Sequence, residues 1–164
     1  MFPDDIQLAA EAVIHAAIKA GVLIATAESC TGGLVSGALT AVAGSSAALD
    51  RGFVTYSNEA KAELLGVSEG LLTQFGAVSE PVARAMTLGA VDRSRASAAV
   101  SITGIAGPGG GSLQKPVGLV HFAAVGPQGG VVHVERRFGE IGREAVRLES
   151  VRVALALLLD AVTT

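Results

Sequence analysis

Three clusters of small polar residues, each placed after an apolar stretch, carry the groups of this sequence that could do chemistry. The clusters are Glu28-Ser29-Cys30-Thr31, then Tyr56-Ser57-Asn58 with Lys61, and then Thr103 with the glycine-rich segment 104–112. Each apolar stretch is typical of a buried strand, and the carboxyl ends of parallel strands meet at one edge of an open α/β sheet, where ligands bind. If the three strands are parallel, the sequence predicts one site built from all three clusters.

Lys61 is the ionisable residue of these clusters with the clearest chemical use. Ser57 and Asn58 can cap the helix that contains Lys61, and if Asn58 is the cap, the lysine lies in the first turn, where the helix dipole disfavours a cation. Partial burial would lower the pKa of the amine in the same direction. A neutral amine beside a hydroxyl acts as a general base, and Tyr56 could relay the proton or orient the amine. The alternative is a solvated surface lysine.

Ser29 is the first candidate nucleophile, because a strand-to-helix turn exposes a hydroxyl and supplies backbone N–H groups for an oxyanion. Its neighbours are not the glycines of a G-x-S-x-G elbow, and a helix-capping serine is the alternative. Ser45 and Ser46 compete for the role, with an ordinary turn as their alternative. Cys30 has no histidine near it in the sequence, so we interpret it as a small buried residue.

Two glycine-rich features are typical of anion binding. Gly32 and Gly33 precede a helix, and a turn of this kind aims backbone N–H groups at a ligand above the sheet edge. The segment 104–112 lacks the Lys-Ser/Thr ending of a P-loop, but its N–H groups could surround a phosphate; a flexible surface loop is the alternative. Arg143 and Arg147 lie one helical turn apart, and they either bind an anion or form a solvated face.

Apolar periodicity and turn signals predict the elements that position these groups. We expect helices over 4–19, 34–43, 59–66, 69–74, 79–94 and 142–161, and strands from residue 22 and over 52–56, 98–103, 118–125 and 131–138. Residues 126–130 join the last two strands as a hairpin turn. Alternating strands and helices followed by a hairpin indicate a mixed, mainly parallel sheet with helices on both faces.

Length and composition limit the class of protein. The 164 residues fit a single domain, 1–164, and half of them are hydrophobic, which favours helices packed on a sheet. A net charge of −3, with scattered lysines and arginines, gives no electrostatic footprint for nucleic acid. The acidic N-terminus and the lack of an apolar run of about 20 residues predict a cytoplasmic protein without a membrane segment. The apolar content leaves room for an oligomer interface.

Cysteine and histidine usage gives no signal for a metal centre. One cysteine excludes an intramolecular disulfide and a cysteine-rich metal site. His15, His121 and His133 lack the spacing of metal ligands, so we expect each to be hydrogen-bonded or solvated. We therefore expect neither a metal nor a cofactor.

Several blocks of the sequence, taken together, resemble one known family. They are TAESCTGG (26–33), GSS (44–46), GFVTYSNEAK (52–61), GAVSEP (76–81), TGIAGPGG (103–110) and KPVG (115–118), in this order along nearly the whole chain. The combination closely resembles the CinA C-terminal domain family, whose members act as nicotinamide-nucleotide amidohydrolases. These enzymes convert nicotinamide mononucleotide and water to nicotinate mononucleotide and ammonia, in the recycling of NAD.

The resemblance implies a three-layer α/β/α sandwich, usually oligomeric, and a serine–lysine amidase with tyrosine support and no metal. Matched motif by motif, Lys61 is the lysine and Tyr56 is the tyrosine. Ser46 lies in a second serine motif that the family shares, so the nucleophile is Ser29 or Ser46. The residues expected to hold the substrate, a small pyridine nucleotide, are Glu28, Thr31, Gly32, Gly33, Ser45, Asn58, Thr103, Gly104, Gly107, Gly109 and Arg143.

Many members carry an additional N-terminal domain that resembles molybdopterin-binding proteins and is linked to ADP-ribose hydrolysis. The 164 residues have no room for it, so we expect that activity and its metal to be absent. Some members have names linked to competence and DNA damage, but nothing in this sequence supports direct DNA binding. The alternative function is a non-catalytic nucleotide-binding or regulatory module, which would keep the pocket without the chemistry.

Overall fold

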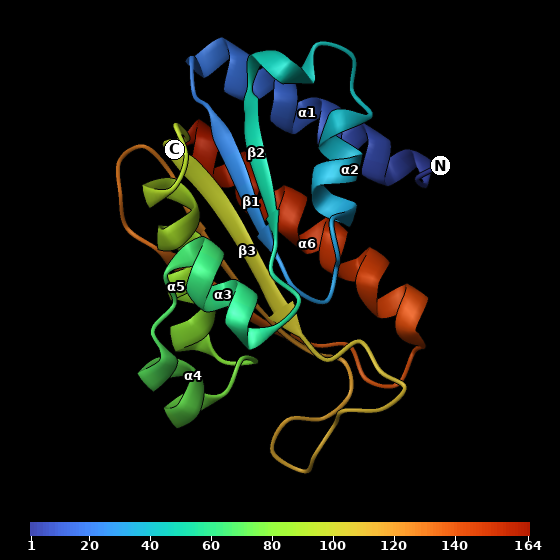
Figure 1. The fold of residues 1–164 in the computed structure, drawn as a ribbon. Coiled ribbons are helices and arrows are strands. Elements are labelled where there is room, and N and C mark those ends of the chain that lie inside the picture. The colour runs from blue at the N-terminus through green and yellow to red at the C-terminus, as the bar shows by residue number, and fades with distance from the viewer.

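Five strands form one sheet in the order β2-β1-β3-β4-β5 in a computed structural model that describes all of residues 1–164 (Figure 1). The strands are β1 (Ile24–Glu28), β2 (Leu49–Val54), β3 (Ala98–Gly104), β4 (Leu119–Val125) and β5 (Val132–Arg137). β1 pairs in parallel with β2 and β3, whereas β4 is antiparallel to both β3 and β5. All strands except β4 therefore point the same way, which confirms the mixed, mainly parallel sheet.

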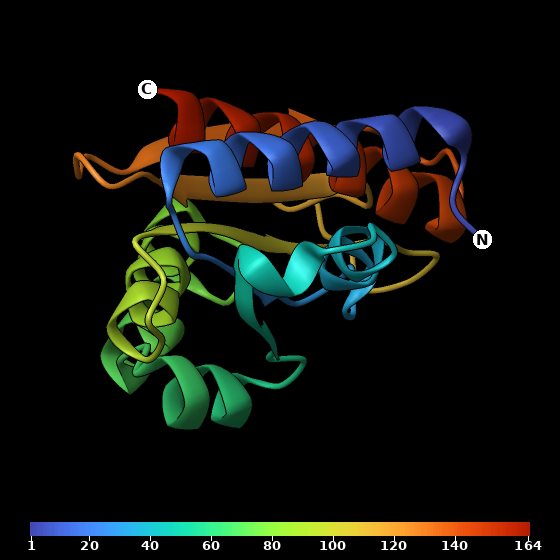
Figure 2. The same ribbon diagram turned by 90° about the horizontal axis from the view of Figure 1, so that it is seen from above.

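Helices cover both faces of this sheet and make three layers (Figure 2). One face carries α1 (Asp4–Ala20), α2 (Leu34–Thr40) and α6 (Arg143–Thr163), and the other carries α3 (Asn58–Leu65), α4 (Glu69–Phe75) and α5 (Glu80–Asp92). The predicted α/β/α sandwich is thus confirmed. No helix combines the length and the hydropathy that crossing a bilayer requires.

The two faces of the sheet differ in how much apolar surface they bury. The cluster beneath α1, α2 and α6 contains 25 buried residues, and the cluster on the α5 face contains 11. β1, β3 and β4 are buried along nearly their whole length, as expected for central strands covered on both sides. The smaller apolar cluster therefore lies on the α3–α5 face, whereas the larger one is covered by α1, α2 and α6.

Most of the predicted elements are confirmed, with shifts of a few residues at their ends. The largest shift is in β2, which begins at Leu49 and ends at Val54, so that Tyr56 lies beyond the strand. Gly52, which we expected at the start of the strand, lies inside it, at a point where α2 passes close to the strand. A Cβ at Gly52 would lie 2.1 Å from the Ser36 hydroxyl oxygen, so only glycine fits there.

The parallel register aligns the carboxyl ends of the first three strands. Glu28, the last residue of β1, lies opposite Val54 of β2 on one side and Ile102 of β3 on the other. The segments that follow these strands therefore leave the sheet at the same edge, as the sequence predicts. Figure 1 shows the long connection after β3 extending beyond this edge.

Candidate active site

A buried lysine contacts a serine at this edge of the sheet. Ser29 directly follows β1, and its N–H donates to the Ile102 carbonyl at 2.9 Å, so the backbone beneath the hydroxyl is tied to β3. Lys61 Nζ lies 3.1 Å from Ser29 Oγ and donates to the Thr55 carbonyl at 2.8 Å. The Lys61 residue is only 1% exposed, which rules out the solvated surface lysine.

The start of α3 places this lysine. Of the two possible caps, Ser57 is the N-cap: its side chain accepts the Ala60 N–H, and the Lys61 N–H bonds to its carbonyl. Lys61 is in the first turn, and its side chain runs back toward the helix N-terminus and the strand ends, as helical side chains do. The prediction of a first-turn lysine is confirmed.

Burial lowers the pKa of the Lys61 amine below its ordinary value of 10.5, because the charged form loses its hydration. The neighbouring Cys30 acts in the opposite direction and is the smaller cause. Burial also raises the pKa of the Cys30 thiol to about 11, so this cysteine stays protonated at neutral pH. Cys30 is therefore the small buried residue that the sequence predicts, and Lys61 is the basic group of the site.

The serine and the lysine open into a pocket of about 270 Å³. Its lining brings together most of the predicted site residues, which are Ser29, Tyr56, Asn58, Lys61, Thr103, Gly104, Gly107, Gly109 and Arg143. A second cavity of about 200 Å³ lies between the β4–β5 turn and the end of α6, and Asp160 is its only charged lining residue. The first pocket combines a buried amine, the serine hydroxyl in contact with it and an arginine.

Arg143, at the start of α6, joins two walls of this pocket. One guanidinium nitrogen donates to the Gly107 carbonyl at 2.8 Å, and another donates to the Tyr56 hydroxyl at 3.0 Å. Tyr56 is 63% exposed and has no hydrogen bond to Lys61 or Ser29. The expected relay between Tyr56 and the lysine is thus not formed in this arrangement, where the tyrosine is held by Arg143 instead.

Comparison with known proteins places these features in a family. The CinA C-terminal domain model matches residues 6–162. The chain belongs to the CinA C-terminal domain family. The nicotinamide-nucleotide amidohydrolases PncC of Enterobacter agglomerans and Escherichia coli K12 are each 54% identical to it. The first matches over 89% of both chains, and the second over 87% of this chain and 86% of its own.

A solved structure of the family superposes on the whole chain. The competence/damage inducible protein CihA from Agrobacterium tumefaciens has a TM-score of 0.96 and 55% sequence identity, and the match covers 100% of this chain and 99% of that one. Another, from Klebsiella pneumoniae, has a TM-score of 0.90 at 36% identity over 96% and 97% of the two chains. The three-layer architecture is therefore that of the CinA family.

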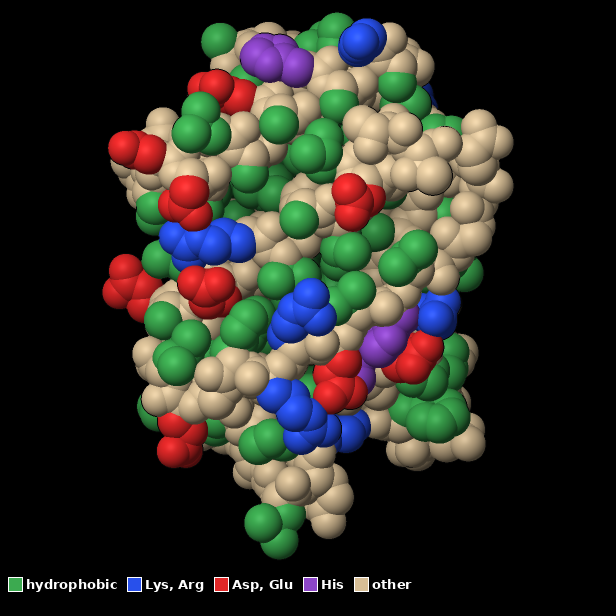
Figure 3. Space-filling view, turned by 180° about the vertical axis from the view of Figure 1, so that it is seen from behind, with side chains coloured by type: hydrophobic (Ala, Val, Ile, Leu, Met, Phe, Trp, Pro, Cys, Tyr) green, Lys and Arg blue, Asp and Glu red, His purple; other side chains and the backbone are tan.

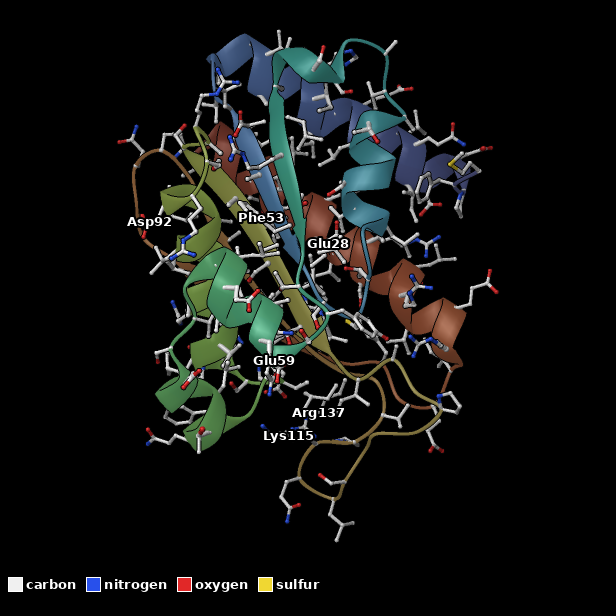
Figure 4. The ribbon with its side chains drawn as sticks, viewed as in Figure 1. Glu28, Phe53, Glu59, Asp92, Lys115 and Arg137 are labelled. Atoms are coloured by element: carbon white, nitrogen blue, oxygen red, sulfur yellow. The ribbon has the colours of Figure 1, made fainter.

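Glu28 does not line the pocket of this CinA-family domain, although we expected it to hold the substrate. Successive strand residues point to opposite faces, so Glu28 points toward α2 (Figure 4). Ser29, by contrast, lines the pocket. The Glu28 carboxylate is fully buried and accepts the Val35 N–H, the Ser36 N–H and the Ser36 hydroxyl, each at 3.0 Å. Its observed role is to cap α2 beneath the turn that carries Ser29.

Ser45 and Ser46 lie at the other end of the sheet. They form the one-turn helix Ser45–Ala47 just before β2, and they line a separate hollow that includes Thr40 and Asp50. At about 3.3 Å per residue, the length of β2 separates this end from the Lys61 pocket by roughly 20 Å. Within one chain, Ser46 therefore has no contact with the base, and Ser45 no contact with the pocket; the geometry favours Ser29 as the nucleophile.

Thr31, Gly32 and Gly33 also lie outside the pocket lining. Thr31 is completely buried, and the two glycines adopt the left-handed region, with φ of 57° and 97°, which lets the chain reverse before α2 begins. We expected these three residues to hold the substrate, and that expectation stays a prediction. Their role in this structure is to shape the turn that follows Ser29.

The histidines take no part in the pocket. His15 is exposed, and His121 Nδ1 lies 2.9 Å from His133 Nε2 across β4 and β5. Glu80 and Glu135 flank the pair, and Figure 3 shows histidine side chains among acidic and basic ones on the rear face. The expectation of solvated or hydrogen-bonded histidines is confirmed. No group of three or more His, Cys, Asp or Glu side chains is arranged to hold a metal ion.

Some pocket residues were not predicted individually. They are Cys30, Ala77, Val78, Ile105, Ala106 and Gly110. Ala77 and Val78 connect α4 to α5, and the Ala77 carbonyl accepts the Thr103 hydroxyl at 2.8 Å, which draws this connection over the end of β3. A signal for them existed, because GAVSEP (76–81) is one of the blocks that resemble the family.

Proposed function

We propose that this chain hydrolyses the carboxamide of nicotinamide mononucleotide to nicotinate mononucleotide and ammonia, an amidohydrolase reaction of NAD recycling. The names of its 54% identical PncC relatives support this substrate. The observation that carries the chemistry is the contact between the buried Lys61 amine and the Ser29 hydroxyl at the pocket.

In the proposed reaction, neutral Lys61 takes the proton of Ser29 as Oγ attacks the amide carbonyl carbon. The resulting Lys61 ammonium donates that proton to the amide nitrogen, and ammonia leaves as the carbon–nitrogen bond breaks. Water then attacks the acyl-serine ester, with Lys61 again accepting a proton. The carboxylate product leaves, and the Ser29 hydroxyl is restored. Donation from Lys61 Nζ to the Thr55 carbonyl holds the amine in place through these steps.

The backbone N–H of Cys30, next to Ser29, is the proposed oxyanion donor. The Ser29 N–H bonds to Ile102 and the Gly32 N–H bonds to the Ser29 carbonyl, so neither is free to receive an oxyanion. The Cys30 N–H has no acceptor within the chain, and Cys30 lines the pocket, whereas Thr31 is completely buried outside the lining. Each donor of this kind typically contributes about 3 kcal/mol to stabilisation of the transition state.

The nucleotide part of the substrate has a separate set of proposed contacts. The loop from Gly104 to Gly110 and the Arg143 guanidinium form the outer wall of the pocket, next to Asn58. Backbone N–H groups and a cation suit a ribose phosphate. We place the phosphate at this wall and the carboxamide at Ser29. The proposed reaction uses no metal or cofactor.

Incubation of the purified chain with nicotinamide mononucleotide tests the function directly. We expect one ammonia and one nicotinate mononucleotide per substrate consumed, and far slower release from free nicotinamide, which lacks the ribose phosphate. Binding of the mononucleotide without ammonia release would instead support the non-catalytic module. That alternative leaves unexplained why a lysine is buried against a serine.

The activity is expected to rise with pH. The base must be neutral to accept the Ser29 proton, so kcat/KM increases as pH passes upward through the pKa of Lys61 and levels off above it. Because burial lowers that pKa, the inflection should lie below 10.5. Initial rates of ammonia release across the alkaline range, with circular dichroism at each pH as the control for folding, measure it. An activity that falls as pH rises toward 10.5 in a folded protein would contradict Lys61 as the base.

A further inference from the structure

Arg147 reaches from α6 to the turn that follows Ser29. Its Nε donates to the Cys30 carbonyl at 3.1 Å, and a terminal guanidinium nitrogen donates to the Thr31 carbonyl at 3.2 Å. The side chain thus bonds two consecutive carbonyls on residues more than 110 positions earlier in the chain. Unlike Arg143, it does not line the pocket, so it is not placed to touch a ligand there.

These two bonds fix the residue that follows the serine. Arg147 holds the carbonyl of Cys30, and the peptide unit on the other side of this residue, which carries the Cys30 N–H, is held by donation from the Gly32 N–H to the Ser29 carbonyl. Because peptide units are planar, little freedom remains for the direction of the Cys30 N–H. This N–H has no acceptor in the chain, and Cys30 lines the pocket.

The charge of Arg147 adds to this positional effect. Hydrogen bonds from a cation are stronger than neutral ones, so the guanidinium holds these carbonyls more firmly than a neutral donor would. The bidentate fork of a guanidinium also suits two fixed carbonyls better than a single ammonium group does. Glu28 holds the other end of the same turn through the Val35 and Ser36 N–H groups. The turn is therefore anchored at both ends by charged side chains outside the pocket.

We propose that Arg147 is a positioning residue for amide hydrolysis, which fixes Cys30 in the turn after Ser29 so that the Cys30 N–H can receive the oxyanion formed by attack of Ser29. This inference rests on the proposed function. It differs from a structural tether because it predicts an effect on the chemical step that exceeds any effect on substrate binding or stability.

Steady-state kinetics of ammonia release from nicotinamide mononucleotide test the proposal with three variants. Arg147→Gln is expected to lower kcat by about 10- to 100-fold, somewhat less than the loss of an oxyanion donor itself, with KM changed less than about threefold. Arg147→Lys keeps the charge but not the bidentate geometry, so it should recover part of the lost kcat. Arg152→Gln is the matched control on the same helix. Arg152 pairs with Asp5 and Glu149 away from the pocket, and its removal should leave kcat within about twofold.

Rates are measured well below the melting temperature of each variant, so that partial unfolding does not lower kcat. A kcat of Arg147→Gln within about twofold of the unmodified chain would overturn the positioning role. A raised KM with unchanged kcat would also overturn it, because Arg147 would then act in substrate binding. If the unmodified chain itself released no ammonia, the proposed function would fail first, and the two failures are thereby distinguished.

Discussion

Replacement of Lys61 by methionine is expected to lower ammonia release from nicotinamide mononucleotide by about 10³-fold, within the range typical for loss of a general base. The variant keeps the length and the apolar stem of the side chain but removes the amine that contacts Ser29 Oγ. Without a base at this position, the serine hydroxyl attacks only as a weak nucleophile. The measurement is kcat/KM for the variant and the unmodified chain at one pH in the alkaline range.

Stability is the control for this result, because Lys61 is the largest fully buried side chain of the chain. Methionine fills a similar volume and avoids burying an amine, which offsets the hydrogen bond lost by the Thr55 carbonyl. We therefore expect a melting temperature close to that of the unmodified chain. Lys19→Met, at an exposed position in the last turn of α1, is the matched variant and should retain full activity. A Lys61→Met protein with most of its turnover would show that another group is the base.

Ser29→Ala is expected to abolish turnover, by at least about 10³-fold, while Ser46→Ala leaves it unchanged. Ser29 Oγ is the hydroxyl in contact with the Lys61 amine, whereas Ser46 lies beyond the opposite end of β2. Ser29→Ala removes one hydroxyl and leaves Lys61 in place, so substrate binding should persist. Isothermal titration calorimetry of the inactive variant with nicotinamide mononucleotide measures that binding.

The paired serine variants also test whether one chain contains the whole site. Loss of activity in Ser46→Ala with retention in Ser29→Ala would exclude the proposed nucleophile. Because the two ends of the sheet are too far apart within a chain, that result would require a hydroxyl from a second copy to reach the Lys61 pocket. Loss of activity in both variants without loss of folding would indicate that Ser46 is needed in some other way.

Local sequence signals were sufficient to predict the helices and strands and the edge of the sheet at which the polar clusters meet. The apolar runs before Glu28 and Gly104 predict central strands, because only residues buried on both faces read as continuous apolar segments. The spacing of Lys61 from Ser57 and Asn58 places it in the first turn of a helix whichever residue caps it. The convergence of three polar clusters then follows from parallel pairing alone.

Which way each side chain faces was harder to predict. Glu28 ends β1 and Ser29 follows it, so strand alternation turns the two side chains to opposite faces and only Ser29 lines the pocket. Thr31 lies beyond the strand, in the turn before α2, where this alternation no longer applies, and it is buried outside the lining. Ser45 and Ser46 were retained as candidates because of the serine motif, although they precede β2, and parallel pairing puts the start of that strand at the end of the sheet opposite the pocket. From the sequence we expected Arg147 to bind an anion or to be solvated, whereas its guanidinium donates hydrogen bonds to two backbone carbonyls.

The sequence by itself determined the kinds of elements, their order and the candidate groups at the strand ends, because periodicity, caps and glycines act over a few neighbouring residues. Only the tertiary structure decided that Lys61 is buried against Ser29, that Ser46 is remote, and that Arg147 holds the turn. Burial and distance between residues far apart in the chain arise from packing of whole layers. The lowered pKa of Lys61, on which the proposed chemistry depends, is a consequence of that packing.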